Sequence, residues 1–142
     1  MYATLDDLIA RAGDEIRQLA DRDRDGTPDP EVISAALTDA AQTIDAYLAV
    51  RYVVPLAVPP PAMVQGWATS IARYRLHRNG PPDHVVADYK DALRQLADAS
   101  AGRLLLTGVD GVSAPVSDAT GGVHVASDDP VFGAPGALDG WR

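Results

Sequence analysis

The sequence contains no cysteine, and its 12 lysine and arginine residues are outnumbered by 20 aspartates and glutamates. Without cysteine the chain forms no disulfide, holds no metal through thiolates and carries no cysteine nucleophile, which fits a reducing compartment such as the cytoplasm. The formal charge of −8 at pH 7 argues against a protein that grips duplex DNA, because non-specific binding depends on cationic contacts to phosphates. Such a protein can still stand beside DNA.

Targeting and catalytic motifs are also missing from the sequence. Asp6 and Asp7 occupy positions where a signal peptide needs basic residues, and no uncharged apolar run reaches the roughly 18 residues that span a bilayer. The histidines form no HExxH motif and no recognisable Ser-His-Asp grouping, and Gly121-Gly122 lacks the lysine and flanking elements of a phosphate-binding loop. We therefore expect no export, no membrane anchor and no enzyme.

The residues that are present have ordinary globular composition. With 46% hydrophobic and 23% charged residues in 142, the chain can build one domain around a single modest core. Apolar residues recur at spacings of three and four through the first hundred positions, which predicts α-helices. We expect four helices, at about residues 4–19, 29–48, 61–77 and 83–101. Gly13 weakens the first by about 1 kcal/mol relative to alanine.

Several residues define the ends and the buried faces of these helices. Asp29 is expected to cap the second helix, with Pro30 in its first turn. Trp67, Tyr74 and Tyr89 fall at buried positions of the third and fourth helices, which places them in the core. The sequence therefore predicts an all-α fold, a small four-helix bundle over residues 1–102.

The composition changes after Gly102. The last 40 residues hold seven glycines and three prolines, which predicts a long, mostly irregular C-terminal tail over residues 103–142. Within it, residues 123–126 alternate in the manner of a short β-strand that could pair with the edge of a neighbouring sheet.

Large apolar residues stand isolated in this tail. They have no core of their own, so either another chain supplies a pocket for them or the tail folds back on its own helices. We favour docking on a partner, and the candidate partner-binding residues are Val123, Val125, Phe132, Leu138 and Trp141.

One metal-like motif lies between the first two predicted helices, in the acidic loop of residues 21–26. Asp21, Asp23 and Asp25 followed by Gly26 reproduce the opening half of a calcium-binding EF-hand loop. The closing half is absent, because Val32 stands where a bidentate carboxylate is needed. The loop is therefore either a calcium site or a plain interhelical turn, and we favour the turn. No other cofactor is expected.

A basic cluster ends the third predicted helix, at Arg73, Arg75, His77 and Arg78. These residues could form a patch that touches an acidic partner, nucleic acid or a neighbouring subunit. The simpler interpretation is a solvated helix end whose cations suit the negative end of the helix dipole.

Several spaced patches carry a resemblance to a known family. The chain resembles the small head-to-tail connector proteins of Mu-like tailed phages over most of residues 1–108, in the segments at residues 1–8, 44–48, 51–56, 72–76 and 89–93. The resemblance implies a helical adaptor that forms a ring, typically of twelve copies, beneath the portal. Such a ring extends the channel through which DNA passes and offers a platform for the next neck or tail protein.

The resemblance also implies that the C-terminal segment contacts the portal, and that the protein is made in the host cytoplasm and resides in the neck of the virion. The sequence therefore leaves two candidate functions of different classes. The first is a structural head-to-tail adaptor, and the alternative is a calcium-binding helical interaction module that uses the acidic loop.

Overall fold

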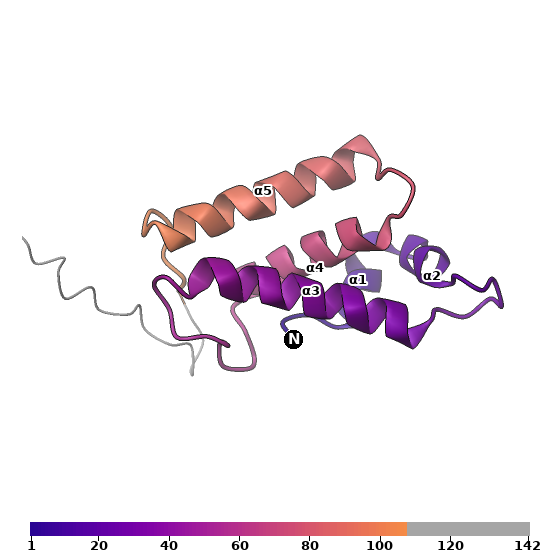
Figure 1. The fold of residues 1–142 in the computed structure, drawn as a ribbon, viewed down its shortest axis with the longest axis horizontal. Helices are drawn as coiled ribbons and strands as arrows, with labels where there is room; N and C mark the ends of the chain where they lie inside the picture. The colour runs from indigo at the N-terminus through magenta and orange to yellow at the C-terminus, as the bar shows by residue number, and fades with distance from the viewer. Residues whose placement is uncertain (108–142) are drawn as a thin grey trace, which may run out of the picture.

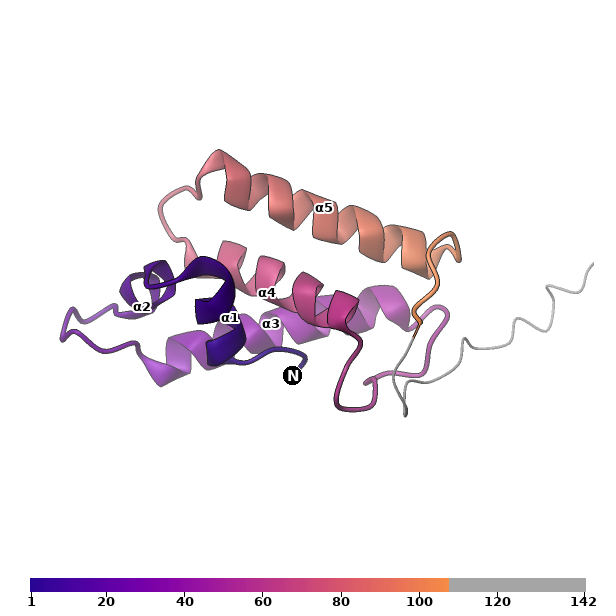
Figure 2. The same cartoon turned by 180° about the vertical axis from the view of Figure 1, so that it is seen from behind.

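A computed structural model describes residues 1–107 of the chain. This part contains five helices: α1 (Leu5–Ala12), α2 (Glu15–Ala20), α3 (Pro30–Leu48), α4 (Ala62–Leu76) and α5 (Asp83–Ser100). The three long helices lie side by side, with α4 packed against both α3 and α5, and the two short helices lie against α3 and α4 near the start of α3 (Figure 1; Figure 2). The predicted all-α helical bundle is confirmed.

The number of helices differs from the prediction, because the first one is broken in two at Gly13. A capping box between Thr4 and Asp7 starts α1. Gly13 then adopts φ 69° and donates its N–H to the Ile9 carbonyl at 2.7 Å, which ends the helix. Glycine adopts this φ readily, whereas a residue with a Cβ is strained there. Gly13, which we expected only to weaken the helix, therefore ends it.

Helix α3 begins as expected, at Asp29 and Pro30, but Asp29 does not cap it with its side chain. The Asp29 carboxylate instead accepts the Arg22 N–H at 2.9 Å, and the Asp29 N–H is donated to the Ala20 carbonyl at 3.0 Å. The residue that begins α3 thus holds the α2–α3 loop closed against the end of α2.

The core lies between the long helices and includes residues from the N-terminus and the corner. Trp67 is buried as predicted, and its Nε1 donates to Gln95 Oε1 at 2.7 Å across α4 and α5. Tyr74 and Tyr89 are half-buried and stack with ring centroids 3.9 Å apart, joining the same two helices. The aromatic residues therefore fix the α4–α5 pair.

Tyr2 ties three distant segments together. Its hydroxyl donates a hydrogen bond to Asp45 on α3 and accepts the Leu56 N–H at 2.8 Å. Burial and the hydrogen bond to Asp45 raise the pKa of Tyr2 to about 12. One side chain therefore joins the N-terminus, α3 and the corner that precedes α4.

We expect Tyr2→Phe to lower the free energy of unfolding by about 1–3 kcal/mol, because the Leu56 N–H and the Asp45 carboxylate lose a partner in a protected position. Chemical denaturation followed by circular dichroism measures the change. Tyr47→Phe, which removes a hydroxyl from a half-buried tyrosine on α3, is the matched control. Equal stability of the two variants would contradict a special role for Tyr2.

Candidate functional site

The predicted partner-binding residues of the tail, Val123, Val125, Phe132, Leu138 and Trp141, lie outside the described residues, as does the possible strand at residues 123–126. The described chain reaches only the start of the tail. There Leu104 and Leu106 pack against the core, and the Leu106 N–H is donated to the Tyr52 hydroxyl at 3.1 Å. The start of the tail is therefore held against the bundle beside Tyr52.

The acidic loop brings its three aspartates together. One carboxylate oxygen from each of Asp21, Asp23 and Asp25 lies within 4.8 Å of the others. Arg24 and Gly26 both have positive φ, 63° and 92°, which curls the backbone around the carboxylates. Gly26 adopts its positive φ without steric cost, whereas Arg24, which has a Cβ, is strained at its positive φ.

Main-chain hydrogen bonds occupy these carboxylates. Asp21 accepts the N–H groups of Asp25 at 3.0 Å and of Gly26 at 2.9 Å, and Asp23 accepts that of Asp25 at 3.2 Å. Asp25 accepts both the N–H and the hydroxyl of Thr27, which lowers the pKa of Asp25. These bonds account for the turn without an ion, so calcium binding stays a prediction of the sequence.

The basic cluster at the end of α4 is divided by the structure. Arg73 turns inward, where its side chain is 13% exposed and contacts Glu15 of α2 at 2.8 Å and His84 Nε2 at 3.2 Å. Arg75 and Arg78 are exposed. The interpretation of the cluster as a solvated helix end is therefore wrong for Arg73. This residue of α4 contacts Glu15 of α2, 58 positions away, and His84 of α5, 11 positions away, and so joins three helices.

His77, another member of this cluster, has its Nε2 buried and without a hydrogen-bond partner among the described residues. Burial lowers the pKa of His77, with Arg73 and His84 acting in the same direction and Glu15 opposing them. Since the folded state takes up this proton less readily than the unfolded state, His77 contributes stability above about pH 6.5 that is lost as the pH falls.

We expect the unfolding free energy of the wild type to fall more steeply between pH 8 and pH 5 than that of His77→Gln, which cannot take up the proton. Denaturant titrations of both proteins across this range measure the difference. Parallel pH profiles would show that His77 titrates alike in the folded and unfolded states.

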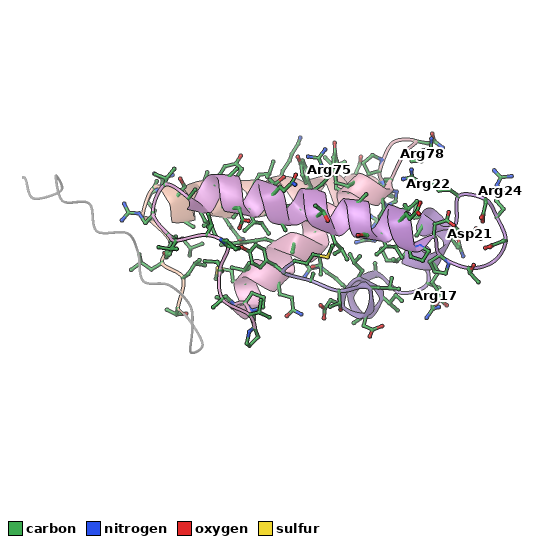
Figure 3. All side chains as sticks on the ribbon, turned by 60° about the horizontal axis from the view of Figure 1, so that its bottom comes forward. Arg17, Asp21, Arg22, Arg24, Arg75 and Arg78 are labelled. Carbon is green, nitrogen blue, oxygen red and sulfur yellow. The ribbon has the colours of Figure 1, made fainter. Side chains whose placement is uncertain are left out.

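Four exposed arginines from separate segments line two cavities near the start of α3. Arg22 and Arg24 come from the α2–α3 loop, and Arg75 and Arg78 come from the end of α4 and the turn after it; we call these four residues the arginine end. In Figure 3, Arg22, Arg24 and Arg78 lie at the end of the bundle, and Arg75 lies further along it. Arg22, Arg24 and Arg78 line one cavity of about 300 Å³ with His77, while Arg22 and Arg75 line a second of about 350 Å³. Helical periodicity carries no signal for this meeting, because the pairs are about 50 positions apart.

A family described as Bacteriophage Mu, Gp36 matches residues 2–125 of the chain. The chain belongs to this Gp36 family. It is 35% identical over 133 residues to Gene product J of Escherichia phage Mu, covering 92% of the chain and 93% of that protein. It is also 36% identical over 107 residues to the Mu-like prophage FluMu protein gp36 of Haemophilus influenzae, covering 75% of each chain.

Membership of the Gp36 family confirms the resemblance to proteins of Mu-like phages that the sequence patches carried. The match extends beyond the bundle to residue 125, so it includes the first part of the tail with Val123 and Val125. Within residues 1–107 of this Gp36-family chain, no helix is both long and apolar enough to cross a membrane.

Proposed function

We propose that this Gp36-family chain is a structural protein of a phage particle, a head-to-tail adaptor that forms a ring beneath the portal and joins the head to the tail. The family match over residues 2–125 carries the proposal, because the helical bundle and the first part of the tail both match proteins of Mu-like phages. By the resemblance of the sequence to connector proteins, the ring holds twelve copies and sits in the virion neck.

The physical character of the chain supports a role in assembly. Its formal charge of −8 would line a channel with negative potential, which lets a duplex slide through instead of adhering. The ion pair between Arg73 of α4 and Glu15 of α2, at 2.8 Å, joins two helices to each other. In this proposal the chain has no catalytic role.

The tail supplies the contact with the portal in this proposal. Phe132, Leu138 and Trp141 would fill apolar pockets on the portal, with Val123 and Val125 adding a short strand. A ring of twelve such tails binds far more tightly than one, because each contact after the first is made at high effective concentration. The ring would then present its other face to the next neck or tail protein.

Cosedimentation with the cognate portal protein tests this function. We expect the full chain to bind, and a chain ending at Gly122 to lose at least tenfold in affinity, because the three terminal anchors are removed together. Phe132→Ala combined with Trp141→Ala should produce most of this loss in a chain of full length.

Val58→Ala is the matched control for these tail variants, since Val58 is a large apolar residue that is 76% exposed on the bundle. It should bind the portal as the wild type does. If neither the full chain nor the control cosediments with the portal, the adaptor proposal is wrong.

A further inference from the structure

The four arginines of the arginine end form no ion pair within the described part of the chain. Arg22, Arg24, Arg75 and Arg78 are all exposed, and within residues 1–107 no carboxylate lies within 4.0 Å of their guanidinium groups. In Figure 3, Arg22 and Arg78 lie close together, with Arg24 projecting from the loop beside them. Arg17, which lies on the other side in the same view, is paired with Asp14 at 3.4 Å.

The surface between these arginines is shaped to receive a side chain. The two cavities share Arg22 and Leu76, and Val32 and Ala36 of α3 also line the second. One carboxylate lines each cavity, Asp21 the first and Asp39 the second, so basic groups outnumber acidic ones around a partly apolar floor. Such a surface suits a peptide segment that combines carboxylates with a nearby apolar residue.

The loop's own aspartates form no ion pair with its arginines. The carboxylates of Asp21, Asp23 and Asp25 accept main-chain hydrogen bonds of the loop, although Asp23 and Asp25 are exposed, and neither the Arg22 nor the Arg24 guanidinium contacts them within 4.0 Å. The guanidinium groups of Arg22 and Arg24 are therefore accessible to a partner.

Duplex DNA is a poor occupant of this surface. A duplex presents a long row of phosphates, and non-specific binding requires many cations spread over a wide face. Four arginines at one end of a chain with a formal charge of −8 do not provide that face. A short acidic segment, in contrast, places its charge only where the arginines are.

The chain itself contains such a segment. Residues 108–142 hold five aspartates against one arginine, which accounts for half of the formal charge of −8. Asp128 and Asp129 are the adjacent pair among them, and Val131 follows two residues later. The segment at residues 127–131 therefore offers two carboxylates and an apolar side chain.

The described part of the tail and the arginine end lie at opposite ends of α3. Leu106 is held at Tyr52, four residues after the end of α3, whereas Arg22 and Arg24 lie in the loop that precedes its start. The 19 residues of α3 span about 28 Å, and the 21 residues from 107 to 128 reach at most about 70 Å. Asp128 can therefore reach past its own bundle to another copy.

We propose that the arginine end binds the acidic segment at residues 127–131 of a second copy of this chain. The contact joins two different surfaces of neighbouring copies, and such a heterologous contact generates a closed ring or a filament, whereas contact within one chain generates neither. The inference rests on the ring of the proposed function and names the contact between its neighbours. Phe132, Leu138 and Trp141, which follow this segment, stay available to the portal.

Disulfide cross-linking tests the contact, because the chain has no cysteine of its own. One full-length variant carries Asn79→Cys, beside Arg78 on the exposed turn, and a tagged full-length variant carries Ser127→Cys, beside Asp128. We expect a mixture of the two at low salt to give at least fivefold more tagged-untagged dimer than a mixture in which Ala97→Cys replaces Asn79→Cys. Ala97 is also exposed, on α5.

Charge reversal decides whether the arginines hold the segment. Asp128→Lys with Asp129→Lys in the tagged chain should reduce the dimer to the control yield. Adding Arg75→Glu with Arg78→Glu to the other chain should restore it, and this rescue also shows that the variants are folded. The proposal is overturned if the Asn79→Cys and Ser127→Cys mixture gives only the control yield of dimer. It is also overturned if neither charge reversal changes that yield.

Two further outcomes would assign the arginine end to another occupant. If a chain with both Asn79→Cys and Ser127→Cys closes on itself while mixed single variants give the control yield, the segment binds its own bundle and the proposal is overturned. The proposal is also overturned if the arginine variants bind labelled duplex DNA more weakly than the wild type, as measured by fluorescence anisotropy, while the dimer yield stays unchanged. Portal cosedimentation of the same variants separates failure of this contact from failure of the adaptor function.

Discussion

Trp67→Ala is expected to lower the free energy of unfolding by about 3–5 kcal/mol, the largest effect of any single substitution considered for this chain. Trp67 is only 3% exposed, so its removal leaves a cavity between α4 and α5 that the surrounding helices fill only in part. Gln95 also loses the indole N–H that it accepts at 2.7 Å. The thermal midpoint should fall by about 10–20 °C, which differential scanning calorimetry measures.

Trp67→Phe separates the two causes. Phenylalanine keeps most of the aromatic volume but cannot donate to Gln95, so we expect a loss of only about 1–2 kcal/mol. If the phenylalanine variant is as unstable as the alanine variant, the hydrogen bond to Gln95 matters more than the packing, contrary to our expectation.

Arg73→Met is expected to lower the free energy of unfolding by about 2 kcal/mol. Its long apolar stem is retained in methionine, but Glu15 loses a guanidinium that it contacts at 2.8 Å in a largely covered position. The effect is smaller than for a fully buried pair, because the Glu15 side chain is 33% exposed and water can solvate the carboxylate. Denaturant unfolding at low and high salt measures both the loss and its screening.

Arg75→Met is the matched control for this substitution. Arg75 lies two positions further along α4, but it is exposed and forms no ion pair within residues 1–107, so we expect a change within about 0.5 kcal/mol. Equal losses at the two positions would mean that the contact with Glu15 does not stabilise the bundle.

These substitutions separate residues that hold the bundle together from exposed residues that form no ion pair within residues 1–107. Arg73 belongs to the first group and Arg75 to the second, although they are two positions apart in the same helix. A variant that loses binding without losing stability is therefore informative only at positions such as Arg75 and Arg78. The same reasoning places Val58 and Asn79 among the useful control and labelling positions, because both are exposed.

Local patterns in the sequence predicted much of this fold. The apolar spacing located α3, α4 and α5 within a few residues, because a helix that buries one face must repeat its apolar residues every three to four positions. The Asp29-Pro30 pair marked the start of α3, since proline at the first turn has no N–H to leave unpaired. Family membership was also visible in the sequence, through patches spread along the bundle.

The break between α1 and α2 at Gly13 could not be predicted from the local pattern of apolar residues. The apolar positions continue in step through α1 and α2, so periodicity predicted one helix where the structure has two. The two segments pack in different directions, with α1 contacting α4 and α2 contacting both α3 and α4. Tertiary packing decided that Gly13 would adopt a positive φ, a choice that glycine permits but does not impose.

The sequence by itself determined the helical class, the acidic charge, the absence of thiol chemistry and the family. Only the tertiary structure decided which charges meet. It paired Arg73 with Glu15 and brought Arg22 and Arg24 to Arg78 across about 50 positions of chain, because the packing of α2, α3 and α4 sets these distances. Periodicity records which face of a helix is buried, but the identity of the neighbour on that face depends on the whole fold.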